Sequence, residues 1–187
     1  MKTICLYFEI HQITHLKRYR FFEIGSDHYY YDDYANEQGI NEVAERSYIP
    51  VLNTLIDMAK NNGGAFKVAL SISGVALEQL EIHAPAVIEL LHELNATGCC
   101  EFICEPYSHG LSSLANEDCF REDVENMRKE VKDYFGQDPK IFRNSSLIYD
   151  NEIGGIVASM GFKGMLVEGA KHVLGWKSPH YLYHCAE

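Results

Sequence analysis

Residues 140–150 read KIFRNSSLIYD and begin the segment that decides the fold. We predict a strand at Lys140–Phe142, a polar strand end at Arg143–Ser146, a helix at Ile153–Met160 that ends at Gly161, and a second strand at Gly164–Val167. A strand, a helix and a strand in this order form the unit from which parallel sheets are built. The sequence therefore predicts an α/β fold with parallel strands.

The rest of the chain repeats this alternation. Further strands are expected at Lys2–Phe8, Phe66–Ile72 and Cys99–Cys104, helices at Gly39–Asn62, at Pro85–Asn95 and between Asn116 and Gly136, and a last extended stretch at Tyr181–His184. Pro50 divides or kinks the first of these helices, and Asn116 is placed to cap the third. Gly25–Ala35, which contains HYYYDDY, is interpreted as a loop packed by its own rings, with a sugar-stacking lid as the functional alternative.

Length and charge limit the class of protein. The 187 residues, of which 47% are hydrophobic, suit one domain with a buried core over residues 1–187. A formal net charge of -11 opposes binding to phosphate backbones or anionic lipid, so neither nucleic acid nor a membrane is an expected partner. Glu9 and His11 interrupt the apolar start of the chain, which argues against a signal peptide and favours a cytoplasmic location.

The cysteines fit buried, reduced thiols better than a disulfide framework. They are Cys5, Cys99, Cys100, Cys104, Cys119 and Cys185. Cys100 and Cys104 have a spacing that occurs in zinc sites, but no second Cys or His pair follows them at finger spacing. We therefore expect no metal and no cofactor.

Polar side chains follow four of the predicted strands. Because active sites of parallel β/α folds lie at the carboxyl ends of the strands, these side chains are candidate site residues. Their carboxylates, imidazoles and one indole suit a saccharide, which needs hydrogen-bonding groups for its hydroxyls and aromatic faces for its C–H surface. The residues are Glu9, His11 and Gln12; Glu101, Glu105, Tyr107 and His109; Arg143, Asn144, Ser145 and Ser146; and Glu168, His172 and Trp176.

An ordered set of motifs resembles glycoside hydrolase family 57, in particular its α-amylase-type members. His11-Gln12-Ile13 is similar to the first family motif, His-Gln-Pro, and Gly98-Cys99-Cys100-Glu101 to the second, Gly-x-x-Glu. The resemblance continues through EFICEPYSHGLSSL, KIFRNSSLIYDNEIG and MGFKGMLVEGAKHVLGWKSPHYLY, and so covers essentially the whole chain. It implies the N-terminal part of a distorted (β/α)7-type barrel, incomplete and truncated at its C-terminal end.

The same resemblance implies roles for individual residues. Ser146 occupies the position of the nucleophilic Glu, and a serine hydroxyl lacks the negative charge that such a nucleophile brings to the transition state. The family's acid is an Asp in a motif resembling D-Y-E-T, and no such motif occurs before Glu187. Rescue by Glu105 or Glu152 is disfavoured. The expected contacts to an α-glucan or malto-oligosaccharide are His11, Gln12, Glu101, Glu105, His109, Arg143, Glu168 and Trp176.

Three functions remain open at this point. The first is an α-glucan-active relative of α-amylases and 4-α-glucanotransferases with impaired catalysis. The second is a non-catalytic α-glucan-binding or regulatory protein. The third is a metal-dependent polysaccharide deacetylase, ranked low because Glu105 with His109 and His11 with His15 only partly reproduce its ligand spacing. The sequence does not set the glucan linkage, the choice between hydrolysis and transfer, or the oligomeric state.

Overall fold

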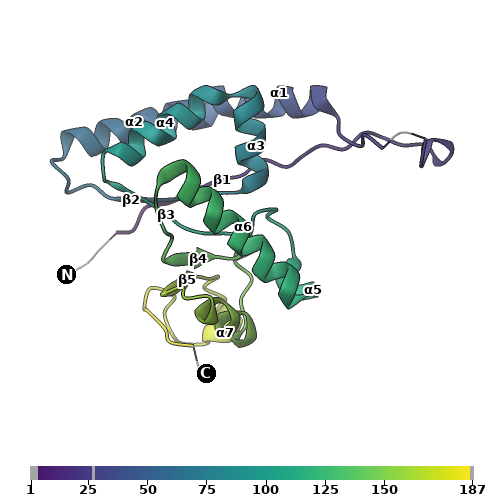
Figure 1. Ribbon diagram of the computed structural model, residues 1–187. Coiled ribbons are helices and arrows are strands. Elements are labelled where there is room, and N and C mark those ends of the chain that lie inside the picture. The colour runs from purple at the N-terminus through teal and green to yellow at the C-terminus, as the bar shows by residue number, and fades with distance from the viewer. Residues whose placement is uncertain (1–3, 27, 186–187) are drawn as a thin grey trace. The chain divides into compact units, whose positions relative to one another are not determined.

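The computed structural model describes residues 4–26 and 28–185 (Figure 1). The chain forms two compact units, Met1–Glu101 and Phe102–Glu187, and each is described by itself.

The first unit is built on a three-stranded sheet in which β2 lies between β1 and β3. β1 (Tyr7–Ile10) pairs with β2 (Val68–Ile72) in a parallel register, and β3 (Cys100–Phe102) begins at the end of this unit. Val68, Leu70 and Ile72 are buried in the core. The predicted strand Lys2–Phe8 was placed too early: it begins at Tyr7 and includes Glu9, because the register with β2 runs to Ile10; Lys2 and Thr3 lie outside the described residues.

The helices of the first unit are α1 (Asp33–Val43), α2 (Ile49–Asn61), α3 (Gly74–His83) and α4 (Pro85–Ala96). The predicted break near Pro50 is confirmed: a π-helical turn, η2 (Ala44–Tyr48), joins α1 to α2, and the Ile49 N–H donates to the Ala44 carbonyl. A proline cannot donate an intrahelical hydrogen bond, and the wider turn accommodates this loss. α3 was not predicted, because it is buried on several sides and shows no single apolar stripe.

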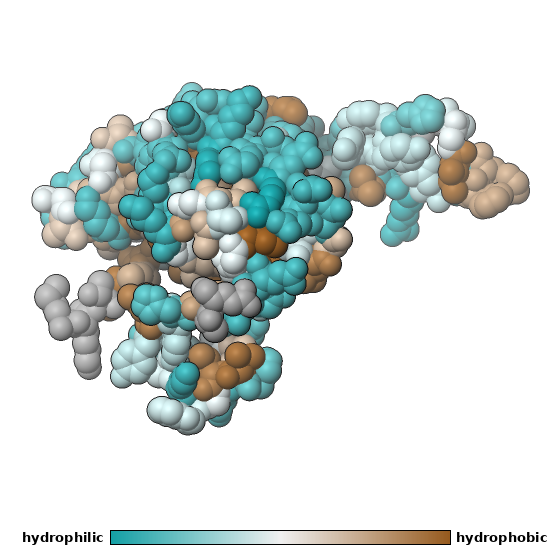
Figure 2. Space-filling view, turned by 60° about the horizontal axis from the view of Figure 1, so that its bottom comes forward, coloured by the Kyte–Doolittle hydropathy of each residue, from teal (hydrophilic) through white to brown (hydrophobic). Residues whose placement is uncertain are grey.

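An extended arm connects β1 to α1 and projects from the helices of its own unit (Figure 1). Leu16 and Tyr31 form an antiparallel bridge at its base, and the short helix η1 (Phe21–Glu23) lies at its tip. The rings of Tyr19 and Tyr30 lie 5.1 Å apart, and those of Tyr29 and Tyr31 lie 5.8 Å apart, as expected for a loop packed by its own rings. Figure 2 shows hydrophobic surface at the tip.

The loop predicted at Gly25–Ala35 ends earlier than expected. The Asp32 side chain accepts a hydrogen bond from the Ala35 N–H, and this N-cap starts α1 at Asp33. A side-chain acceptor at this position satisfies a backbone donor that the helix itself cannot.

The second unit contains the predicted β/α/β segment. β4 (Ile141–Arg143) pairs in parallel with β5 (Gly164–Leu166), α7 (Asn151–Ser159) joins them, and Cys104 forms a parallel bridge to Phe142 on the other side of β4. The described part of the predicted extended stretch Tyr181–His184 forms no strand. The remaining short helices are α5 (Ser112–Ala115), η3 (Ser145–Leu147) and α8 (Lys171–Leu174).

The long helix α6 (Glu117–Phe135) covers this segment and was predicted well. Asn116 caps it through a 2.9 Å hydrogen bond from the Cys119 N–H, and Gly136, with φ +68°, ends it. One face of α6 is buried, and its last member, Phe135, stacks on Phe102 with ring centroids 3.9 Å apart; the buried residues are Phe120, Val124, Met127, Val131 and Phe135. In residues 4–26 and 28–185, no helix has the length and apolar character needed to cross a membrane.

Candidate functional site

The carboxyl ends of three neighbouring segments meet at one edge of the second unit. Glu105 follows the Cys104 bridge, Arg143 ends β4, and Glu168 follows β5, where its N–H donates to the Leu147 carbonyl. In parallel sheets this edge is the usual position of a binding site. Within the second unit, these three segments therefore place their polar ends at one edge.

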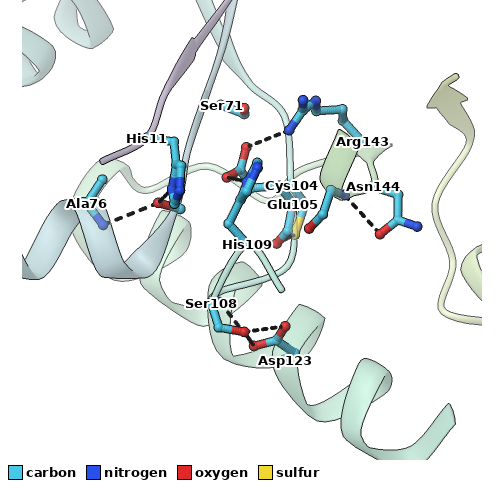
Figure 3. A network of polar contacts seen from close by, with 12 residues as sticks. His11, Ser71, Ala76, Cys104, Glu105, Ser108, His109, Asp123, Arg143 and Asn144 are labelled. Carbon is cyan, nitrogen blue, oxygen red and sulfur yellow. Dashed lines mark hydrogen bonds and ion pairs between the residues drawn. The ribbon is translucent and has the colours of Figure 1, made fainter. Parts of the chain in front are cut away.

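Glu105 is the buried centre of this edge. Its side chain has no exposed surface, Oε1 lies 3.3 Å from His109 Nδ1, and Oε2 lies 3.9 Å from Arg143 Nη1 (Figure 3). A carboxylate held away from water needs such partners, because burial without them costs several kcal/mol. Glu105 and Arg143 were predicted to contact substrate, whereas the structure buries both and leaves the His109 side chain 18% exposed.

The loop that carries His109 is held in a strained conformation. His109 has φ +52°, in the left-handed region that non-glycine residues rarely occupy. Asp123 of α6 fixes the preceding residue, because its carboxylate accepts hydrogen bonds from the Ser108 N–H at 3.1 Å and from Ser108 Oγ at 2.9 Å (Figure 3). Asp123 was missed by the sequence analysis, which considered only strand ends and the loops after them.

A second strained turn carries Ser146. Ser146 is exposed with φ +53°, and the next residue, Leu147, has φ +58°. Asn144 braces the turn from inside: its Nδ2 donates to Ser113 Oγ at 2.9 Å and to the Ile148 carbonyl at 3.0 Å, and its Oδ1 accepts from the Ser145 N–H at 3.0 Å. The side chain of Ser145 is buried, and its Oγ has no hydrogen-bond partner in the structure.

The candidate residues of the first unit lie at the ends of β1 and β2. His11 Nδ1 lies 2.8 Å from Ser73 Oγ, and Ser73 also caps α3 by accepting from the Ala76 N–H at 3.2 Å (Figure 3). The Gln12 carbonyl accepts a 2.9 Å hydrogen bond from Gln79 Nε2. Ser73 was not predicted, although a polar residue directly after a buried strand is the signal that identified the others.

The remaining predicted residues are exposed. Glu101 lies on β3, and Trp176 is 93% exposed. Glu168 lines a cavity of about 800 Å³ in the second unit, together with His172, Lys177 and Tyr183. Glu152, considered as a substitute nucleophile, is exposed in the first turn of α7.

The cysteines form no disulfide in the part of the chain that the structure describes. Burial raises the pKa of Cys100, in the first unit, to about 12 and also raises the pKa of Cys104, in the second unit. These buried thiols resist the deprotonation that a zinc ligand requires. Glu105 and His109 are residue types that also bind metal ions.

A parallel β/α/β unit with polar residues at the carboxyl ends of its strands is the arrangement from which (β/α) barrels are built. The family model "Glycosyl hydrolase family 57" matches residues 5–187. The chain belongs to this family.

Relatives agree with this assignment. A protein from Methanocaldococcus jannaschii named "Putative alpha-amylase" is 40% identical over 182 residues, which cover 94% of this chain and 38% of that protein. The crystal structure of 4-α-glucanotransferase from Thermococcus litoralis matches with a TM-score of 0.59 and 19% identity over 67% of this chain and 19% of that one. The latter supports the fold, a partial (β/α) barrel. The chain spans well under half the length of either relative.

Proposed function

We propose that this chain takes part in α-glucan binding at a glycosidase-type site whose hydrolytic chemistry is impaired. The supporting observation is the turn at Ser146. An exposed non-glycine residue in the left-handed region costs roughly 1–2 kcal/mol, and the buried Asn144 holds it there. We infer from this cost that the turn is shaped to present a side chain at position 146.

The side chain now presented is the wrong one for hydrolysis. A retaining glycosidase needs a carboxylate that attacks the anomeric carbon and an acid that protonates the leaving oxygen. The Ser146 hydroxyl carries no charge and needs a base to remove its proton before it can attack, and Glu152 is exposed in the first turn of α7. The proposed saccharide contacts are His109, Glu168 and Trp176 with the buried Glu105 and Arg143 in the second unit, and His11, Gln12 and Glu101 in the first.

Changing Ser146 to Glu tests this proposal. The substrate is an aryl α-maltoside with a nitrophenol leaving group, because such a group departs as a stable phenolate and needs no protonation. The introduced carboxylate attacks the anomeric carbon, the bond to the aryl oxygen breaks with its electron pair on the phenolate, and the sugar stays bound to the protein as an ester. We expect one equivalent of nitrophenolate and a matching mass increase.

The matched control is Ser47→Glu, which adds a carboxylate at an exposed residue of η2. It should release no nitrophenolate above the background of the natural protein. Maltoheptaose titrated by calorimetry measures binding separately. Binding without any reaction in Ser146→Glu would favour a purely non-catalytic glucan-binding or regulatory role, and absence of both would overturn the proposal.

A further inference from the structure

The main chain leaves the sheet of the first unit directly after β1. The parallel register with β2 ends at Ile10, whose carbonyl accepts a 3.2 Å hydrogen bond from the Ser73 N–H. The next two carbonyls, those of His11 and Gln12, accept hydrogen bonds from side chains that distant helical segments carry. Water commonly fills this role in loops, so two donors from the protein itself indicate that this stretch is held in place.

Tyr48 holds the first of these carbonyls. Its hydroxyl donates to the His11 carbonyl at 3.1 Å, across a separation of 37 residues in the sequence. Tyr48 is the last residue of the π-helical turn η2, and turns of this rare kind are found frequently at functional sites. Burial raises the pKa of Tyr48, so the hydroxyl stays protonated at neutral pH and can donate.

Gln79 holds the second carbonyl. Its Nε2 donates to the Gln12 carbonyl at 2.9 Å and to the Val75 carbonyl at 3.3 Å. The residue is 7% exposed, and its Oε1 is buried without a hydrogen-bond partner among the residues that the structure describes. An unpaired buried amide oxygen destabilises the fold. Because the other buried residues of α3 are apolar, stability alone would favour an apolar side chain at this position.

We propose that Tyr48 and Gln79 are positioning residues that fix the main chain of His11 and Gln12, and so hold the end of β1 in the orientation that a saccharide meets. Donors on two successive carbonyls restrict the rotation of the peptide group between them. The Ser73 hydroxyl, 2.8 Å from His11 Nδ1, holds the ring itself (Figure 3). Binding groups need such support from the residues around them. The saccharide part of this inference rests on the proposed function, whereas the order of the main chain does not.

Changing Gln79 to methionine removes the donor and the unpaired oxygen together. Methionine has a similar length and favours helices. We therefore expect the urea midpoint of unfolding to stay the same or rise, whereas the His11 and Gln12 amides become more mobile in nitrogen-15 relaxation of the full chain. Calorimetric titration should show maltoheptaose binding weakened about two- to tenfold, as for the loss of one hydrogen bond. A residue that served folding alone would show the opposite pattern.

The matched control is Gln38→Met, at an exposed position of α1. It should leave the midpoint, the mobility of the β1 end and the affinity unchanged. Tyr48→Phe is a second test, because it deletes one hydroxyl and keeps the ring. It should raise the mobility of His11 and Gln12 and weaken binding by a similar factor, and it tests the proposal even if Gln79→Met does not fold.

Unchanged mobility of His11 and Gln12 in both variants overturns the positioning role, whether or not a glucan binds. A lower midpoint together with unchanged affinity in Gln79→Met shows that Gln79 serves folding alone, and this overturns its role toward the saccharide. Absence of maltoheptaose binding by the natural protein overturns the proposed function and leaves the relaxation result on Tyr48 and Gln79 standing.

Discussion

Replacing Asn144 with alanine removes the brace of the Ser146 turn. The side chain is fully buried and makes hydrogen bonds to Ser113, Ile148 and Ser145 at 2.9, 3.0 and 3.0 Å. Each such bond contributes about 0.5–1.5 kcal/mol net, and the buried Ser145 N–H loses its acceptor, so the second unit should lose about 2–4 kcal/mol of stability. Removing the Asn144 side chain should therefore lower the stability of the second unit as well as disturb the Ser146 turn.

Hydrogen exchange locates this loss in the structure. The slowest amides of α6 should exchange about 30- to 1,000-fold faster in Asn144→Ala, because 1.4 kcal/mol corresponds to a factor of ten. Asn126→Ala, at an exposed position of α6, is the control and should be neutral or slightly protective because alanine favours helices. A change below about threefold in Asn144→Ala would refute the view that these contacts hold the turn together.

Two further predictions concern the ends of helices and the thiols. Asn116→Ala should lower the free energy of unfolding by about 1 kcal/mol, because the Cys119 N–H loses the side-chain acceptor that caps α6. Asn116→Asp keeps an acceptor and should retain stability. Urea denaturation measures both variants, and equal stability of the two would contradict the role of the cap. Cys119 and Cys185 are exposed, whereas Cys100 has a pKa raised to about 12 by burial, so at pH 8 only about one Cys100 in ten thousand is a thiolate. Iodoacetamide followed by mass spectrometry should label Cys119 and Cys185 in the folded protein and Cys100 only after unfolding. Equal labelling rates of the three thiols in the folded protein would contradict the burial of Cys100.

Helices whose ends carry a capping residue or a proline could be predicted from the local sequence. Asn116 and Gly136 delimit α6 because a side-chain acceptor and a left-handed glycine act at the helix ends themselves. Pro50 likewise marked the break before α2. The bounds of β1 depend instead on its pairing with β2, a partner about 60 residues away in sequence, and local pattern does not contain that register.

The sequence indicated which residue types lie at the candidate site but not how deeply they are buried. Glu105 and Arg143 were identified as polar residues at strand ends, yet both are buried, because each satisfies the other and His109 completes the contact. An acid at one strand end and an arginine at the end of the next strand are compatible with either an exposed or a buried pair. The sequence does not contain the tertiary packing that decides between them.

Backbone strain is the part of the site that sequence could not supply. His109 and Ser146 both adopt left-handed conformations, although neither is glycine or asparagine, the residues that normally indicate such positions. In each case a buried or helix-borne polar side chain from the second unit, Asp123 or Asn144, holds the turn. Two such strained residues, each held by its own polar side chain, cost more conformational free energy than an ordinary loop would. This cost is the structural observation on which the proposed binding function of the edge depends.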